Sequence, residues 1–265
     1  FKGPIYATAP TRDLLEIMLL DSAHIQESEA ELLSRKNRRH GRKAVEPIYT
    51  QADAEQTLPL LVPTDYGKVI SPAPGIEVVY RDAGHILGAA FLEMTVGYDG
   101  SKCRMVFSGD LGRPDQLLLN DPEHPNAPDY LFMESTYGDR DHKNEGRSLD
   151  ELAEAIAYSN AMGEKVIIPA FAVERTQEIL YSLSLLAKDG RLPKGMPIYL
   201  DSPMAIRATE VFRKHPKYLD EETQALIKAG KDPLALPNLH GTLTTEESQA
   251  INSAKGSAGV TAASG

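Results

Sequence analysis

The chain reads Ile168-Pro169-Ala170-Phe171-Ala172-Val173-Glu174-Arg175-Thr176-Gln177-Glu178, a short apolar strand that runs straight into a helix. The same alternation continues on both sides of this stretch, with helical periodicity over 149–162, 173–188 and 203–214 and apolar strands at 166–168 and 197–200. Strands that alternate with helices form a parallel sheet with helices on both faces. The second half of the chain therefore predicts an α/β unit.

The first half of the chain has a different pattern of apolar residues. Apolar runs that read as strands follow one another at 76–80, 91–96, 103–107 and 130–133. They predict a β-rich, layered unit ahead of the strand–helix unit. The polar, turn-rich segment 138–148 separates the two, so we expect two domains, 1–142 and 143–265.

The N-terminal part predicts a strand at residues 1–8 and then a helix from Thr11, as its cap, to about Arg35. The helix leads into a basic run, Arg35 to Lys43, in which six of nine residues are Lys or Arg. A mobile, solvated loop is one interpretation of such a run. The alternative is a surface that extends the path of a nucleic-acid strand through contacts with its phosphates.

Composition narrows the class of protein. The 265 residues include 42% hydrophobic ones, enough for a sizeable core, and carry a net charge of −10, which argues against a general polyanion-binding surface. A single cysteine, Cys103, excludes a disulfide framework and a cysteine-rich zinc site. No apolar run approaches the roughly 18 residues that cross a bilayer. We expect a cytoplasmic protein without a membrane partner.

Two polar residues follow strands at points where ligands collect in layered α/β proteins. His85 comes after Gly84, just past the strand at 76–80, and Asp110 comes just past the strand at 103–107. An imidazole and a carboxylate presented from neighbouring strand ends can chelate a divalent metal. Hydrogen-bonded turns are the alternative interpretation of both stretches.

Three further residues are candidates for chemistry. Glu134 ends an apolar strand, where an acidic side chain needs a polar site, a partner, a metal or a capping role. Arg175 lies in the first turn of a helix, which favours a salt bridge or a phosphate contact. Ser202 precedes Pro203 at the start of the last predicted helix, where ordinary capping explains it.

Several signatures are absent from the sequence. It contains no Gly-x-Gly-x-x-Gly, Walker loop, Gly-x-Ser-x-Gly or His-Glu-x-x-His motif, which disfavours dinucleotide, nucleoside triphosphate, serine-hydrolase and zincin functions. The other histidines form no close ligand pair along the chain; they are His24, His40, His124, His142, His215 and His240.

Five ordered motifs carry a resemblance to a known family. They are Gly-His-Ile-Leu-Gly-Ala-Ala at 84–90, Phe-Ser-Gly-Asp-Leu-Gly at 107–112, Glu-Ser-Thr-Tyr-Gly-Asp-Arg at 134–140, Pro-Ala-Phe-Ala-Val-Glu-Arg at 169–175 and Leu-Asp-Ser-Pro-Met-Ala at 200–205. In this order they resemble the β-CASP branch of the metallo-β-lactamase fold, a group of RNA-processing nucleases. The resemblance implies an α/β chain: part of an αββα sandwich followed by part of a β-CASP cap domain.

The resemblance also implies roles for individual residues. His85 matches a ligand of one zinc, Asp110 matches the aspartate that bridges two zincs, and Glu134 matches an acidic residue that orients a catalytic histidine. Hydrolysis in such enzymes uses two metals that neutralise charge on the phosphate. Arg175 and Ser202 are the expected phosphate neighbours. The implied partner is an RNA substrate, with a homodimer of the full-length parent as a further expectation.

Two family motifs are absent from this chain, the upstream His-x-His-x-Asp-His and the later histidine motifs. We therefore expect a piece of a longer protein that by itself binds zinc weakly or not at all and cleaves no RNA. The full-length parent is expected to be a zinc-dependent exo- or endoribonuclease. A non-catalytic RNA-binding or scaffold relative and a hydrolase of a small ester or thioester on the same fold are the alternatives.

Overall fold

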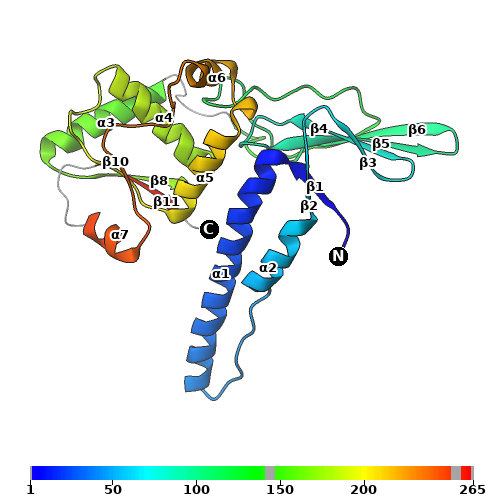
Figure 1. Ribbon diagram of the computed structural model, residues 1–265, viewed down its shortest axis with the longest axis horizontal. Coiled ribbons are helices and arrows are strands. Elements are labelled where there is room, and N and C mark those ends of the chain that lie inside the picture. The colour runs from blue at the N-terminus through cyan, green and yellow to red at the C-terminus, as the bar shows by residue number, and fades with distance from the viewer. Residues whose placement is uncertain (1, 141–146, 252–257, 264–265) are drawn as a thin grey trace. The chain divides into compact units, whose positions relative to one another are not determined.

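The computed structural model describes residues 2–140 and 147–251 in full and the backbone of residues 258–263 (Figure 1). The chain divides into two compact units, the first ending at Asp65 and the second beginning at Tyr66. The domain boundary expected between residues 142 and 143, and His142 with it, lies outside the described residues. That boundary stays a prediction.

The first unit consists of a long helix and a short two-stranded sheet. Strand β1 (Ile5–Thr8) pairs in parallel with β2 (Leu61–Thr64), and between them lie the helices α1 (Ala9–Arg39), α2 (Gln51–Thr57) and the 3₁₀ turn η1 (Leu58–Leu60). Helix α1 begins at Ala9, and its N-cap is Thr8 rather than the predicted Thr11. The Thr8 hydroxyl caps the helix by accepting the Thr11 N–H at 3.3 Å, so Thr11 is the residue that is capped.

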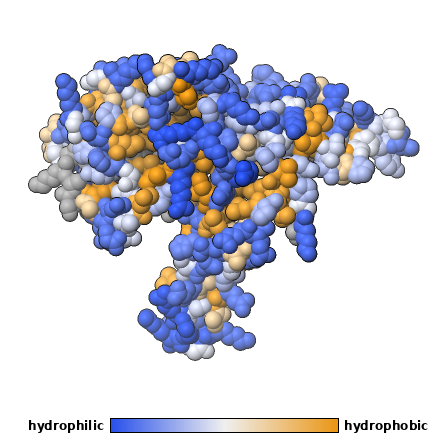
Figure 2. Space-filling view, in the orientation of Figure 1, coloured by the Kyte–Doolittle hydropathy of each residue, from blue (hydrophilic) through white to orange (hydrophobic). Residues whose placement is uncertain are grey.

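The far end of α1 carries the basic run. Residues 35–39 continue the helix instead of forming a loop. The segment that follows folds back on the helix: Val45 N–H donates to Ser34 Oγ at 2.7 Å, and Asn37 Nδ2 donates to the Lys43 carbonyl at 3.0 Å. This end of α1 is covered mainly by hydrophilic residues (Figure 2). The first half of the basic run is therefore helical, and its second half, residues 40–43, is the expected turn and loop, which side-chain hydrogen bonds connect back to the helix.

The second unit starts with a five-stranded sheet, ordered β3-β4-β5-β6-β7. Its strands are β3 (Val69–Ala73), β4 (Ile76–Asp82), β5 (Ala90–Tyr98), β6 (Ser101–Phe107) and β7 (Tyr130–Phe132). Strands β4 and β6 both run antiparallel to β5, and β7 runs parallel to β6. The segments that leave the ends of β4, β6 and β7 therefore emerge at one edge of the sheet.

A parallel sheet follows, as the alternation of strands and helices predicts. Its order is β10-β9-β11-β8, with the strands β8 (Val166–Phe171), β9 (Ile198–Leu200), β10 (Leu239–Gly241) and β11 (Ala258–Ala263). The helices of this half are α3 (Ser148–Met162), α4 (Arg175–Lys188), α5 (Pro203–Lys214), α6 (Glu221–Lys228), α7 (Thr245–Ile251) and the 3₁₀ turn η3 (Pro216–Tyr218). The predicted α/β fold class is confirmed.

Helix α4 begins two residues later than predicted. Glu174 adopts φ 68° and ψ −69°, a backbone conformation that no helix contains. The Arg175 N–H donates to the Val173 carbonyl at 3.0 Å and closes a three-residue γ-turn around Glu174. None of the described helices is long and apolar enough to span a bilayer.

Candidate active site

His85 lies in a tight turn that follows β4. Gly84 has φ +59°, and a Cβ there would stand 2.8 Å from the Asn120 carbonyl oxygen, so only glycine fits. The buried Asp82 carboxylate accepts the Gly84 N–H at 2.9 Å, and Ala83 N–H donates to the Ala89 carbonyl at 3.2 Å. The turn is thus closed at its base, and the His85 side chain is left 42% exposed.

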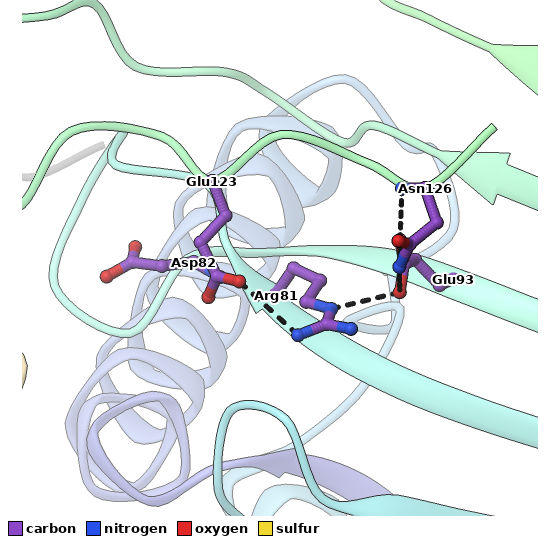
Figure 3. A network of polar contacts seen from close by, with 5 residues as sticks. All are labelled: Arg81, Asp82, Glu93, Glu123 and Asn126. Carbon is purple, nitrogen blue, oxygen red and sulfur yellow. Dashed lines mark hydrogen bonds and ion pairs between the residues drawn. The ribbon is translucent and has the colours of Figure 1, made fainter.

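Behind this turn, a polar network anchors the end of β4 (Figure 3). Arg81 pairs with Glu93 at 2.9 Å and with Glu123 at 3.4 Å, and Asn126 donates to Glu93 through its backbone and its side chain. The backbone N–H of Asp82 donates to Glu123 Oε1 at 3.1 Å. Burial raises the pKa of the Asp82 carboxyl above its ordinary value, opposed mainly by the Gly84 N–H bond.

Asp110 lies in the loop that follows β6. Ser108 ties this loop to the end of β7, because its N–H donates to the Phe132 carbonyl at 2.9 Å and its Oγ accepts the Glu134 N–H at 3.0 Å. On the other side, Gly112 N–H donates to the Ala83 carbonyl at 2.8 Å. The Asp110 loop is therefore joined both to the His85 turn and to the Glu134 segment.

The two predicted metal ligands meet at this edge of the sheet. His85 Nε2 lies 3.9 Å from Asp110 Oδ2, and the Asp110 side chain is 75% exposed. An imidazole nitrogen and a carboxylate oxygen are donor types that bind divalent cations, and at this separation both could bind the same cation. Within the described ranges, no group of three or more His, Cys, Asp and Glu side chains could hold a metal. The pair supplies only half of a four-coordinate site.

Glu134 follows β7, the third strand that ends at this edge of the sheet. Its Oε1 accepts the Leu111 N–H at 2.5 Å, which fixes the residue next to Asp110. The pKa of Glu134 lies below its ordinary value, because the Thr136 side chain and the Leu111 N–H bond to the carboxylate and His85 adds a favourable charge. Glu134 is thus an ionised carboxylate close to the His85–Asp110 pair.

Arg175 and Ser202 have structural partners. Arg175 pairs with Glu178 at 2.7 Å across one turn of α4, and its side chain is 60% exposed. Ser202 is buried, and its Oγ accepts the Ala205 N–H at 3.2 Å as the N-cap of α5. The salt bridge and the cap considered from the sequence are both confirmed. A phosphate contact at either residue stays a prediction.

Sequence reasoning missed Glu174. Its side chain is buried, and Oε2 accepts the N–H of Leu87, two residues after His85, at 2.8 Å. The sequence offers one signal, an acidic residue at a strand-to-helix junction beside Arg175. The contact itself spans 87 positions, so no local pattern could have indicated it.

Comparisons with known proteins bear on both halves of the chain. Residues 176–265 match the family described as Beta-Casp domain. The whole chain is 37% identical to Ribonuclease TTHA0252 of Thermus thermophilus, covering 56% of that protein. It is 32% identical to Transcription termination factor FttA of Pyrococcus abyssi, again over the whole chain and covering 39% of that protein. The chain thus spans about half the length, or less, of the curated relatives it matches.

A solved structure is also similar, though weakly. The crystal structure of BJP-1, a subclass B3 metallo-β-lactamase of Bradyrhizobium japonicum, has 14% sequence identity and a TM-score of 0.23. The match covers 86% of this chain and 66% of that one. A similarity this low does not bear on the arrangement of the strands described above.

Proposed function

Because the chain belongs to the β-CASP family of metallo-hydrolases, we propose that the full-length protein is a metal-dependent nuclease that cleaves RNA phosphodiester bonds. One observation carries the proposal: His85 and Asp110 lie 3.9 Å apart at one sheet edge, where Glu134 holds the residue next to Asp110. The name ribonuclease, which the Thermus thermophilus relative bears, agrees with an RNA substrate.

Zinc is the metal we propose, with His85 and Asp110 among its ligands. Imidazole nitrogen and carboxylate oxygen are ligands that Zn²⁺ accepts. When bound, the metal would neutralise charge on the scissile phosphate and so lower the barrier to hydrolysis. Two donors leave a tetrahedral site incomplete, so the remaining ligands would come from parts of the full-length protein outside this chain.

Glu134 supports the site without holding the metal. Its carboxylate is kept ionised by the hydrogen bonds from Leu111 and Thr136, and it fixes the backbone beside Asp110. An ionised carboxylate so close to the pair can also orient a protonated histidine from elsewhere in the full-length protein. We assign Glu134 this orienting role in catalysis.

Phosphates of the RNA are proposed to contact the start of the parallel-sheet half. Arg175 is the better candidate, because its guanidinium is 60% exposed although it pairs with Glu178. Ser202 is buried and its hydroxyl already caps α5, so a phosphate would reach it only if the cap rearranged. Contacts of this kind are sensitive to salt and only weakly specific for sequence.

A second candidate function is an RNA-binding role in transcription termination without cleavage. The relatives named Transcription termination factor FttA favour it. The retained His85, Asp110 and Glu134 favour the nuclease, since a scaffold needs none of them. A small ester or thioester substrate is disfavoured by the β-CASP domain. We further propose that the full-length protein is cytoplasmic and that it forms a homodimer. Light scattering on the purified protein tests the homodimer.

RNA cleavage by the full-length protein tests the proposal. End-labelled single-stranded RNA is incubated with the metal-stripped protein, then with added Zn²⁺ or Mn²⁺. Activity should return with the metal and fall by at least about a hundredfold in His85→Ala and Asp110→Asn, because each removes a ligand. The length of the labelled products distinguishes exonucleolytic from endonucleolytic cleavage.

Asp99→Asn is the matched control, since Asp99 is an exposed carboxylate in the β5–β6 turn and its φ of 48° suits asparagine. It should cleave like the wild type. Binding of RNA without metal-dependent cleavage would instead favour the second candidate.

A further inference from the structure

A buried carboxyl connects the two sheets of the second unit. Glu174 lies in the γ-turn between β8 and α4, and its Oε2 accepts the Leu87 N–H at 2.8 Å. Leu87 belongs to the turn that carries His85 and is itself fully buried. This hydrogen bond therefore joins the start of α4 to the His85 turn, directly and without exposure to solvent.

His85 is held on both sides by carboxyl groups. On the N-terminal side, Asp82 Oδ1 accepts the Gly84 N–H at 2.9 Å. On the C-terminal side, Glu174 Oε2 accepts the Leu87 N–H. The Asp82 contact is local to the turn, spanning two residues, whereas the Glu174 contact comes from another sheet. Together they fix the backbone from which the His85 imidazole projects.

The backbone conformation and the burial of Glu174 both cost free energy, which distinguishes it from an ordinary buried side chain. Its φ of 68° and ψ of −69° are unfavourable for any residue with a Cβ. Its second oxygen, Oε1, has no hydrogen-bond partner in the described part of the chain. Burial, and then the neighbouring Glu178, raise the pKa of Glu174 well above its ordinary value. Strain and an orphaned polar atom persist where the surrounding structure imposes them, and they cluster at functional sites.

We propose that Glu174 is a positioning residue for His85: its carboxyl fixes the Leu87 amide, so the placement of the imidazole at the metal site depends on helix α4. The inference rests on the proposed function only in giving His85 a metal to bind. A displacement of α4 would move the His85 turn with it, because the Glu174 carboxyl accepts the Leu87 N–H directly. The β-CASP half thus helps to build the metal site.

Amide hydrogen exchange in the full-length, metal-free protein tests the contact itself. Glu174→Gly removes the carboxyl and also relieves the strained φ, so the variant should fold. Exchange of the Leu87 amide should accelerate about tenfold relative to wild type, the effect of losing one buried hydrogen bond. Glu174→Gln keeps an acceptor oxygen and should remain close to wild type. Unchanged exchange at Leu87 in Glu174→Gly would overturn the proposal.

Glu178→Gln is the matched control. Glu178 is one turn along α4, about as buried as Glu174, and pairs with Arg175 instead of the His85 turn. The Glu178→Gln variant should leave the exchange rate of the Leu87 amide unchanged. If it accelerated this exchange as much as Glu174→Gly does, the effect would be a general destabilisation of α4, and the proposal would be overturned.

Zinc affinity and cleavage then connect the contact to the site. In Glu174→Gly, the dissociation constant for Zn²⁺ should rise about tenfold, as for other residues that orient a ligand, and Glu174→Gln should restore it. The kcat for RNA should fall while KM changes little. If the wild type cleaves no RNA but exchange and zinc affinity respond as stated, the nuclease proposal fails and the positioning role stands. Zinc affinity that is the same in Glu174→Gly and wild type overturns the positioning role even if the wild type cleaves RNA.

Discussion

Gly112 faces the carbonyl oxygen of Gly84 so closely that a Cβ on Gly112 would stand 1.7 Å from it. The two glycines belong to the Asp110 loop and the His85 turn, so the contact brings the two proposed ligands together. Glycine at position 112 is required by this approach rather than by its φ, which is not in the left-handed region.

Gly112→Ala should force the two loops apart. We expect a loss of about 1–3 kcal/mol in the free energy of unfolding, the usual effect of overpacking, together with loss of metal binding. Urea denaturation and zinc titration of the full-length protein measure the two effects. Gly97→Ala is the control, because a Cβ there meets its nearest atom at 3.7 Å. Equal stability in the two variants would contradict the close approach.

Zinc binding should distinguish this chain from the full-length protein. His85 and Asp110 supply two donors, and a tetrahedral site needs four, so residues 1–265 alone should bind Zn²⁺ weakly or not at all. Equilibrium dialysis of both proteins at the same pH measures the difference. A tight, stoichiometric complex with residues 1–265 would disprove this expectation, and His85→Ala would then show whether the proposed pair holds the ion.

The basic end of α1 should contribute to RNA binding. Its six Lys and Arg residues, between Arg35 and Lys43, lie exposed at the end of α1 and in the segment that follows it, within a chain of net charge −10. Neutralising them to Gln in the full-length protein should flatten the dependence of RNA affinity on salt. The logarithmic slope should change by about 0.7 for each phosphate that the variant no longer neutralises.

Fluorescence anisotropy at several salt concentrations gives this slope. Replacing Lys228 and Lys231, exposed at the end of α6, with Gln provides a control for net charge. A slope that stays the same after neutralisation of the basic run would reject its role.

Stability should depend on pH through Glu174. Because the pKa of Glu174 is raised in the folded protein, the folded state holds a proton that the unfolded state releases above about pH 4.5. The stability that this protonated carboxyl contributes is complete below that pH and declines as the pH rises toward the folded pKa. Glu174→Gln stays neutral, so its free energy of unfolding relative to wild type should increase with pH over this range.

Urea denaturation of the full-length protein at a series of pH values measures the difference. Glu154→Gln removes an exposed carboxylate of α3 and should run parallel to wild type. A constant difference between Glu174→Gln and wild type at all pH values would show that Glu174 ionises alike in the folded and unfolded states.

Much of the fold could be read from local patterns. Helix α5 spans Pro203–Lys214 as predicted, because Ser202 and Pro203 form a strong start signal. The strands β4, β5 and β6 contain the predicted apolar runs 76–80, 91–96 and 103–107 and extend beyond them by a few residues, and His85 and Asp110 follow the ends of β4 and β6. That the two residues meet follows from the antiparallel order, since β4 and β6 flank β5 and run in the same direction.

The remaining features depend on contacts between distant residues. The start of α4 was predicted two residues early, because nothing local to Glu174 announces a positive φ in a residue with a Cβ. The cap of α1 was predicted at Thr11, since the sequence offers two threonines and only the extended backbone of Thr8 decides between them. Residues distant in sequence impose the Glu174–Leu87 bond, and no window of sequence contains both partners.

The Asp99–Gly100 turn joins β5 to β6 at the end opposite to the segments that carry His85 and Asp110. It is exposed, and an added Cβ at Gly100 would meet nothing within 4 Å. An affinity tag or a fluorescent dye inserted there would lie a full strand length away from the His85–Asp110 pair. This hairpin is therefore the place to attach the label or tag by which the protein could be immobilised or followed in single molecules.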